Sequence, residues 1–98
     1  DLTTYGSHGE LTRGEYLKER IDSWYIPSRF SVTEVYDTDS ENHRTAFITA
    51  LNNGQNLVNH NDHCNDWVMG TGHLNHGWSI DGYDVDALTN DNQMSNIY

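Results

Sequence analysis

Histidines and the single cysteine of the chain gather in one polar stretch of the sequence. Residues 59–67 read NHNDHCNDW, and two more histidines, His73 and His76, follow shortly afterwards. An imidazole has an ordinary pKa of about 6.5, so it can accept a proton at neutral pH and act as a general base. Imidazole and thiolate groups are also ligands for transition metals. The stretch therefore indicates acid–base or metal chemistry.

Three interpretations of this stretch remain open from the residues alone. In the first, one histidine is the general base for a nucleophile on a neighbouring strand. In the second, His60, His63, Cys64, His73 and His76 bind a metal, with a spacing that matches no established zinc template. In the third, the ring nitrogens satisfy backbone groups of a loop. Because neighbours on an extended backbone point to opposite sides, Cys64 is expected to be a small buried or pocket-lining thiol rather than a nucleophile paired with His63.

Hydrophobic periodicity predicts the elements that position these residues. After an opening loop over residues 1–12, the expected elements are helices over residues 13–23, 43–52 and 81–88, and strands over residues 30–36, 55–59 and 95–98. Between them, residues 60–80 form a long polar loop, and a loop of that length in a small domain is usually functional.

Each of the three predicted helices has an expected buried side. Leu17, Ile21 and Trp24 form the apolar stripe of the first, and its charged residues, Lys18 among them, form a solvated face. Ala46, Phe47, Ala50 and Leu51 form the stripe of the second, and Val85 and Leu88 face inward in the third.

The second predicted helix has signals at both ends. Ser40 or Asn42 can serve as its N-cap, and Asn53 and Gly54 supply a left-handed C-cap. With a strand before it and another directly after it, this helix forms a predicted βαβ unit with parallel strands. Functional sites in such sheets lie beyond the carboxyl ends of the strands, which here means the loop that begins at His60.

Composition narrows the class of protein. The chain has 98 residues, a formal charge of −10 and a hydrophobic share of only 35%. Such a field repels phosphates, so we expect neither nucleic acid nor an anionic membrane as a partner. The small apolar share favours a part of a larger sheet, and the charge suits a soluble extracellular protein.

Several of these segments, in order, resemble the gingipain-like cysteine peptidases (peptidase family C25). The signature run is residues 50–67, ALNNGQNLVNHNDHCNDW, and residues 84–90, DVDALTN, resemble the family's next helix and its ending. Residues 4–6 and 30–37 fall in the expected order, so the likeness extends over residues 4–98. It implies an α/β, caspase-like fold with a mainly parallel sheet flanked by helices, of which residues 1–98 are one part of a single catalytic domain.

The resemblance also implies roles for particular residues. His63 corresponds to the catalytic histidine, and Asp62 and Cys64 flank it where the family has glycine or another small residue. The backbone N–H of Cys64 would donate to the oxyanion, and Trp67 would line the substrate cleft. Glu10 is the nearest upstream candidate by position for the acid that orients the histidine. The nucleophilic cysteine is expected a few residues after Tyr98, so residues 1–98 alone should be inactive.

The expected surroundings of this site follow from the same likeness. The substrate is a peptide or protein, the remainder of the catalytic domain comes from the same precursor or a second chain, and the protein is secreted or on the cell surface. Catalysis needs no cofactor, although the family also binds structural calcium, for which Asp81, Asp84, Asp86 and Asp91 offer oxygen ligands. The competing hypotheses are an inactive binding module with a caspase-like frame and a metal-binding domain that uses His60, His73 and His76.

Overall fold

A computed structural model of the chain describes residues 4–5, 11–12, 14–36, 42–62, 64–71 and 79–98. Within them the order of elements is β1 (Thr4–Tyr5), β2 (Leu11–Thr12), α1 (Gly14–Tyr25), α2 (His43–Asn52), β3 (Leu57–Val58), β4 (Val68–Gly70), β5 (Ser79–Asp81), α3 (Gly82–Asp86) and β6 (Asn96–Ile97). The described chain is therefore a small mixed α/β arrangement.

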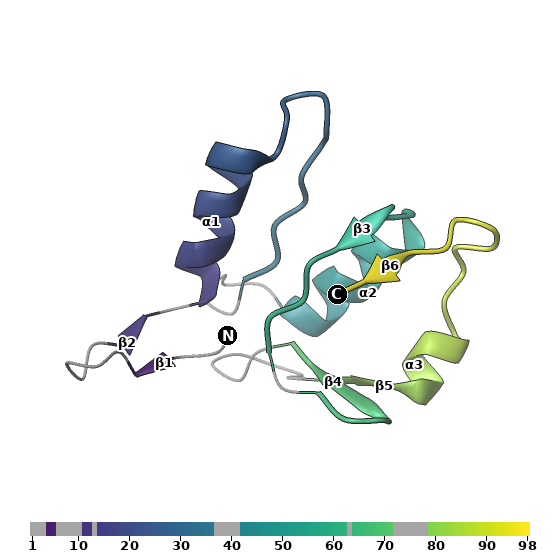
Figure 1. The fold of residues 1–98 in the computed structure, drawn as a ribbon. Helices are drawn as coiled ribbons and strands as arrows, with labels where there is room; N and C mark the ends of the chain where they lie inside the picture. Colours follow the sequence, from purple (N-terminus) through teal and green to yellow (C-terminus); the bar gives the residue numbers. More distant parts are fainter. Residues whose placement is uncertain (1–3, 6–10, 13, 37–41, 63, 72–78) are drawn as a thin grey trace.

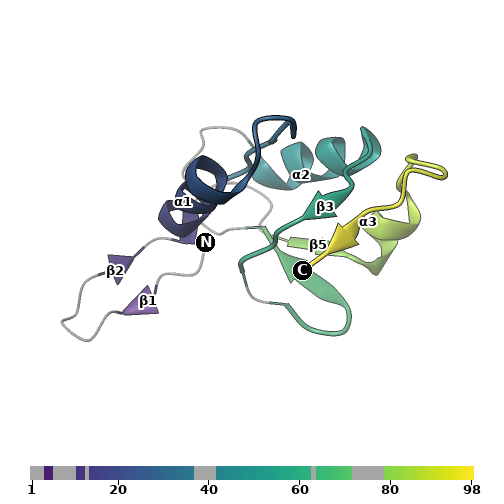
Figure 2. The ribbon, with the colours of Figure 1, turned by 45° about the horizontal axis from the view of Figure 1, so that its top comes forward.

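Three two-stranded sheets organise these elements (Figure 1). β3 and β6 run parallel, with Leu57 opposite Asn96 and Val58 opposite Ile97. β4 and β5 form an antiparallel hairpin, and β1 and β2 form another that projects away from the rest of the molecule (Figure 2). The short parallel sheet agrees with the α/β expectation, whereas a mainly parallel sheet is not formed by the described residues.

Local chemistry sets the limits of α2 where the sequence predicts them. The side chain of Asn42 accepts the Thr45 N–H at 3.0 Å, which satisfies a donor that the first turn leaves open. At the other end Gly54 has a φ of 76°, a left-handed conformation that glycine adopts without strain, and its N–H donates to the Leu51 carbonyl at 3.0 Å. The chain then leads into β3, which begins at Leu57.

The predicted strand over residues 30–36 is not a strand in the structure. Residues 31–36 carry no regular secondary structure, and Phe30 and Val32 remain 55% and 46% exposed. Alternating side chains give a segment the potential for a strand, but only backbone pairing makes one. The predicted βαβ unit is therefore wrong, because the parallel partner of β3 is β6.

The predicted loop over residues 60–80 also differs, because it contains β4, β5 and a tight turn. Asn65 makes the turn: its N–H donates to the Val68 carbonyl at 2.9 Å, and its side-chain oxygen accepts the N–H groups of Trp67 and Val68, both at 2.8 Å. Asn-Asp at residues 65–66 is the sequence signal for this turn. The predicted opening loop likewise contains β1 and β2.

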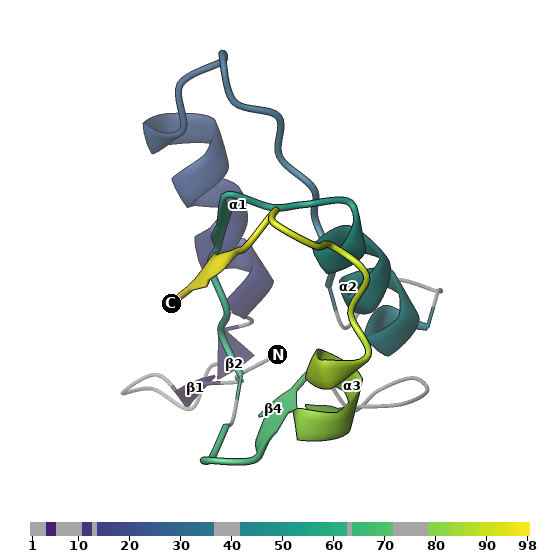
Figure 3. The same ribbon diagram turned by 90° about the vertical axis from the view of Figure 1, so that its right-hand side faces the viewer.

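Little of the described chain is buried. Leu51 and Ile80 are its buried apolar residues, and His43 is its buried polar residue. Leu17 and Trp24 are 55% and 63% exposed, and Val85, expected to face inward, is 51% exposed. The radius of gyration is 14.0 Å, against about 12.6 Å for a compact domain of this length. Apolar side chains of α1 and α3 thus remain exposed. Figure 3 shows these two helices in separate parts of the ribbon.

The N-cap of α2 provides a test of this description. Replacement of Asn42 by alanine removes the acceptor for the Thr45 N–H and should lower the free energy of unfolding by about 1 kcal/mol. Asn42→Ser is the matched control, because serine also caps and should keep most of the stability. Urea unfolding followed by circular dichroism measures both variants, and equal losses in the two would contradict the capping role.

Candidate functional site

The parallel pair of β3 and β6 brings two chain segments to one edge. Beyond the strand limits, the His60 N–H donates to the Tyr98 carbonyl at 2.7 Å, and the Tyr98 N–H donates to the Val58 carbonyl at 2.9 Å. Since the two strands run in the same direction, residues that follow His60 and residues that would follow Tyr98 leave at the same edge. This edge is the candidate site.

His60 is held firmly within this edge. Its Nε2 lies 2.7 Å from the carbonyl oxygen of Gly70, the last residue of β4. A carbonyl only accepts, so Nε2 carries the proton in this contact. The ring thereby joins the end of β3 to the β4–β5 hairpin, and Nε2 is committed to a backbone group rather than to a metal.

The other predicted site residues divide into those that the structure describes and those that it does not. Asp62 is partly buried, and Cys64 is a free, exposed cysteine whose backbone forms an isolated antiparallel bridge with Met69. The catalytic candidate His63, its suggested orienting acid Glu10, and the metal candidates His73 and His76 lie outside the described residues. The edge thus contains Asp62 and Cys64 on either side of position 63.

Trp67, expected along a substrate cleft, lies against the start of α3. Its ring makes an edge-to-face contact with Tyr83, with centroids 5.4 Å apart and planes at 86°. A Cβ at Gly82 would come within 2.6 Å of the Trp67 ring, so glycine is what allows the close approach. With 53% of Trp67 exposed, its packing role is visible in the structure and its cleft role stays a prediction.

Two of the four aspartates suggested as calcium ligands, Asp81 and Asp84, have partners in or near α3. Asp81 caps the helix by accepting the N–H groups of Tyr83 at 2.9 Å and Asp84 at 3.1 Å. Asp84 in turn accepts the Asp81 N–H at 3.1 Å and pairs with Arg44 of α2. The hydrogen bond from Asp81, followed by the pairing with Arg44, lowers the pKa of Asp84. Among the described ranges, no three His, Cys, Asp or Glu side chains gather around a possible metal position.

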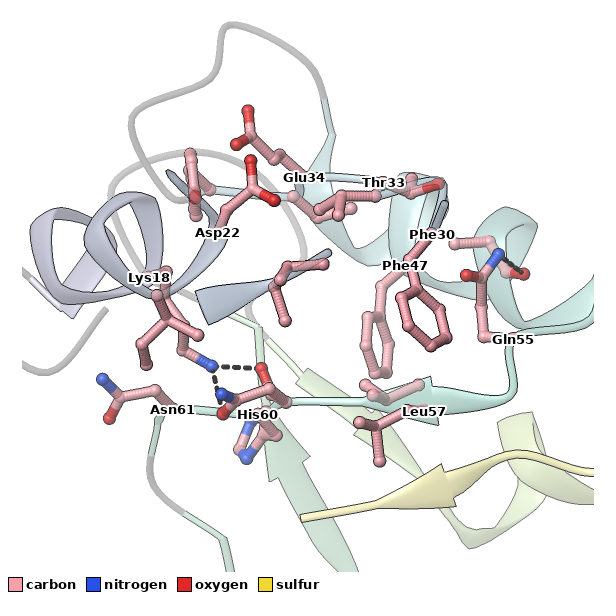
Figure 4. Close-up of a pocket in the computed structure, with 18 of the residues that line it drawn as sticks. Lys18, Asp22, Phe30, Thr33, Glu34, Phe47, Gln55, Leu57, His60 and Asn61 are labelled. Atoms are coloured by element: carbon pink, nitrogen blue, oxygen red, sulfur yellow. Dashed lines mark hydrogen bonds between the residues drawn. The ribbon is translucent and has the colours of Figure 1, made fainter. Parts of the chain in front are cut away.

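A cavity of about 990 Å³ lies beside β3, between α1, the extended segment 30–36 and α2 (Figure 4). Phe30, Phe47 and Leu57 line its apolar end, and Lys18, His60 and Asn61 line the end that adjoins the candidate site. The cavity therefore runs from an apolar region to the carboxyl edge of the parallel pair.

Carboxylates surround the side of this cavity that Tyr36 lines. Burial, the negative charges of Glu34, Glu19 and Asp22, and a hydrogen bond with Glu34 together raise the pKa of Tyr36 to about 12. Nearby negative charge disfavours the phenolate by repulsion, and burial disfavours it by removing the water that solvates its charge. This side of the cavity would thus repel anions.

Sequence reasoning missed Lys18. The sequence predicts a place for Lys18 on the solvated face of the first helix. In the structure its side chain is partly buried and donates to both oxygens of Asn59, with 2.6 Å between Nζ and Oδ1. Burial lowers the pKa of Lys18. Its position one residue past Leu17 gave no signal of this role, because the sequence does not reveal which side of α1 faces β3.

Comparisons with protein-family models, with curated proteins and with solved structures found no match to this chain. Within the described ranges, none of the helices combines the length and the apolar character that a bilayer crossing requires. Inferences about function therefore depend on the edge and on the residues around it.

Tyr36 provides a test of the electrostatics of the cavity. Its pKa is about 12 in the folded chain against 10.0 for the free side chain. The unfolded chain loses this proton first, so the contribution to stability is complete below pH 10 and is lost as the pH rises toward 12. Tyr36→Phe should remove this part of the alkaline loss of stability.

The measurement is urea unfolding at several pH values between 9 and 12. Tyr25→Phe, on the exposed end of α1, is the matched control and should retain the alkaline loss of the parent chain. An identical pH dependence in Tyr36→Phe and the parent would refute the raised pKa.

Proposed function

We propose that this chain is part of the catalytic domain of a secreted or cell-surface, gingipain-like cysteine endopeptidase. In this proposal His63 is the general base for a cysteine thiol carried after Tyr98, in the same precursor or in a second chain. The single observation that carries the proposal is the parallel pairing of β3 with β6 through His60 and Tyr98. The coarse α/β arrangement is compatible with a caspase-like frame.

Simple reach supports the meeting of the two groups. His63 follows His60 by three residues, and three residues span at most about 10 Å. A residue a few positions after Tyr98 has the same limit from the adjacent strand. Because neighbouring strands are only about 4.8 Å apart, a thiol and an imidazole from these two segments are within reach of direct contact.

The proposed chemistry is acyl transfer to a thiolate. The imidazole of His63 takes the proton of the thiol, and the thiolate sulfur attacks the carbonyl carbon of the scissile peptide bond. The backbone N–H of Cys64, which follows the base directly, would donate to the developing oxyanion. The imidazolium then gives its proton to the departing amine, and water hydrolyses the thioester with the imidazole again acting as base.

The described residues are compatible with a substrate approach along this edge. Cys64 is exposed, and its backbone forms a bridge with Met69 beside the turn made by Asn65. The cavity beside β3 opens onto the same edge at His60 and Asn61. The proposal itself requires no metal, and structural calcium would be an addition to it.

The test requires the protein that carries this chain together with the segment after Tyr98. His63→Ala should lower kcat/KM for peptide hydrolysis by about 10²–10⁴-fold, since proton transfer by a positioned base contributes that much. Circular dichroism should show unchanged unfolding, because the change removes chemistry rather than packing. His8→Ala is the matched control, for which no role is proposed.

Two outcomes would contradict the proposal. Undiminished hydrolysis by His63→Ala would remove the general base. If instead the parent protein neither cleaves peptides nor reacts with a thiol-directed peptide probe, the inactive binding module becomes the better interpretation, and a zinc titration would separate it from the metal-binding hypothesis.

A further inference from the structure

Lys18 connects α1 to the end of β3 over a separation of 41 residues. Its ammonium donates to the main-chain oxygen of Asn59 and to the side-chain Oδ1 at 2.6 Å (Figure 4). A lysine has three donors and no acceptor, so two carbonyl-type oxygens on one residue match it well. The contact fixes both the backbone and the side chain of Asn59.

The strand register shows which backbone acceptor of β3 Lys18 contacts. Along β3, the residues that bond to β6 alternate: Asn56 accepts from Asn96 at 3.3 Å, Val58 accepts from Tyr98, and His60 donates to Tyr98. Successive residues of a strand direct their backbone groups to opposite sides, so the carbonyl of Asn59 points to the side of β3 away from β6. Lys18 occupies that acceptor in place of a neighbouring strand.

Contacts from three elements meet at two consecutive residues. On the side of β3 away from β6, Lys18 of α1 donates hydrogen bonds to Asn59. On the side that faces β6, the His60 N–H donates to the Tyr98 carbonyl, and the His60 ring donates to the carbonyl of Gly70 in β4. Only Asn61 and Asp62 then separate this fixed point from His63. The position from which the histidine segment departs is therefore determined from both sides.

We infer that Lys18 is a positioning residue for the segment that carries His63. It acts by fixing Asn59 on the side of β3 that β6 does not cover. The inference deepens the function proposed above and rests on it, but the contact itself can be tested separately. Partial burial lowers the pKa of Lys18, whereas hydrogen bonds to the two Asn59 oxygens favour its charged form.

The first experiment measures backbone hydrogen exchange in the protein that carries this chain. Lys18→Met keeps the alkyl chain and removes the donors. The His60 amide should then exchange on the order of tenfold faster, as expected when a hydrogen bond from a charged group is lost next to it. The amides of Asn53 and Gly54, which belong to the α2 cap, should exchange at the parent rate.

Three further variants make this result specific. Lys18→Arg should restore slow exchange at His60, because its guanidinium can also reach two oxygens. Arg20→Met removes a positive charge from the same helix and should change nothing at His60. Asn59→Ala removes only the side-chain acceptor and should show a smaller, equally local acceleration, which keeps the test valid if Lys18→Met does not fold.

The second experiment uses peptide hydrolysis by the protein that includes the segment after Tyr98. Lys18→Met should lower kcat by on the order of 10–100-fold with unchanged KM, since a small displacement of a catalytic group reduces the chemical step. Lys18→Arg should recover most of kcat, and Arg20→Met should match the parent.

Clear outcomes would overturn the inference. An unchanged His60 amide in Lys18→Met, or acceleration that is uniform over all amides, would show that Lys18 does not fix this edge. If His63→Ala is inactive while Lys18→Met keeps the parent kcat, the inference fails and the proposed function stands. If His63→Ala is fully active while Lys18→Met loosens His60 locally, the proposed function fails and Lys18 keeps only its structural contact.

Discussion

The parallel pairing of β3 with β6 is the constraint on which the arrangement depends. Strands from distant parts of the sequence are joined by backbone hydrogen bonds that extend past both strands to His60 and Tyr98. The chain reaches β3 after α2 and β6 after α3, so this pairing also joins the two stretches of chain that contain these helices. Without it, the polar segment after His60 would have no fixed relation to Tyr98.

Side-chain contacts supplement this pairing because the apolar core is small. Arg44 of α2 pairs with Asp84 of α3, and Lys18 of α1 holds Asn59. Such polar contacts supply direction rather than large amounts of stability. Phe30, Leu57 and Ile97 remain 55%, 61% and 41% exposed, so the elements are held in position while apolar surface is left available for further contacts.

The sequence was most informative where short-range chemistry decides the structure. The limits of α2 follow from Asn42 and Gly54, whose effects act within one turn of helix. The strand expected over residues 30–36 depended on a distant backbone partner, which no local pattern supplies. The hairpin of β4 and β5 was missed because its strands are too short for alternation to be recognised, although Asn65 and Asp66 favour a turn.

The candidate site shows the same division. The polar segment that begins at His60, directly after β3, was expected at a strand's carboxyl end, and the structure has His60 there. The partner of the histidine ring, Gly70, and the holding contact from Lys18 could not be predicted, because each joins segments whose relative placement only the fold determines. The proposed roles of His63, His73 and His76 remain predictions from the sequence.

The long connection between β3 and β6 has a consequence for the order of folding. Helix α2 and the β4–β5 hairpin are stabilised by contacts close in sequence, which form quickly. The β3–β6 pair must instead close a loop that contains the hairpin and α3, and the entropy of that closure opposes it until the intervening elements are compact. The edge where His60 meets Tyr98 is therefore expected to assemble last and to open first, so a nascent chain would acquire its helices well before any site at this edge.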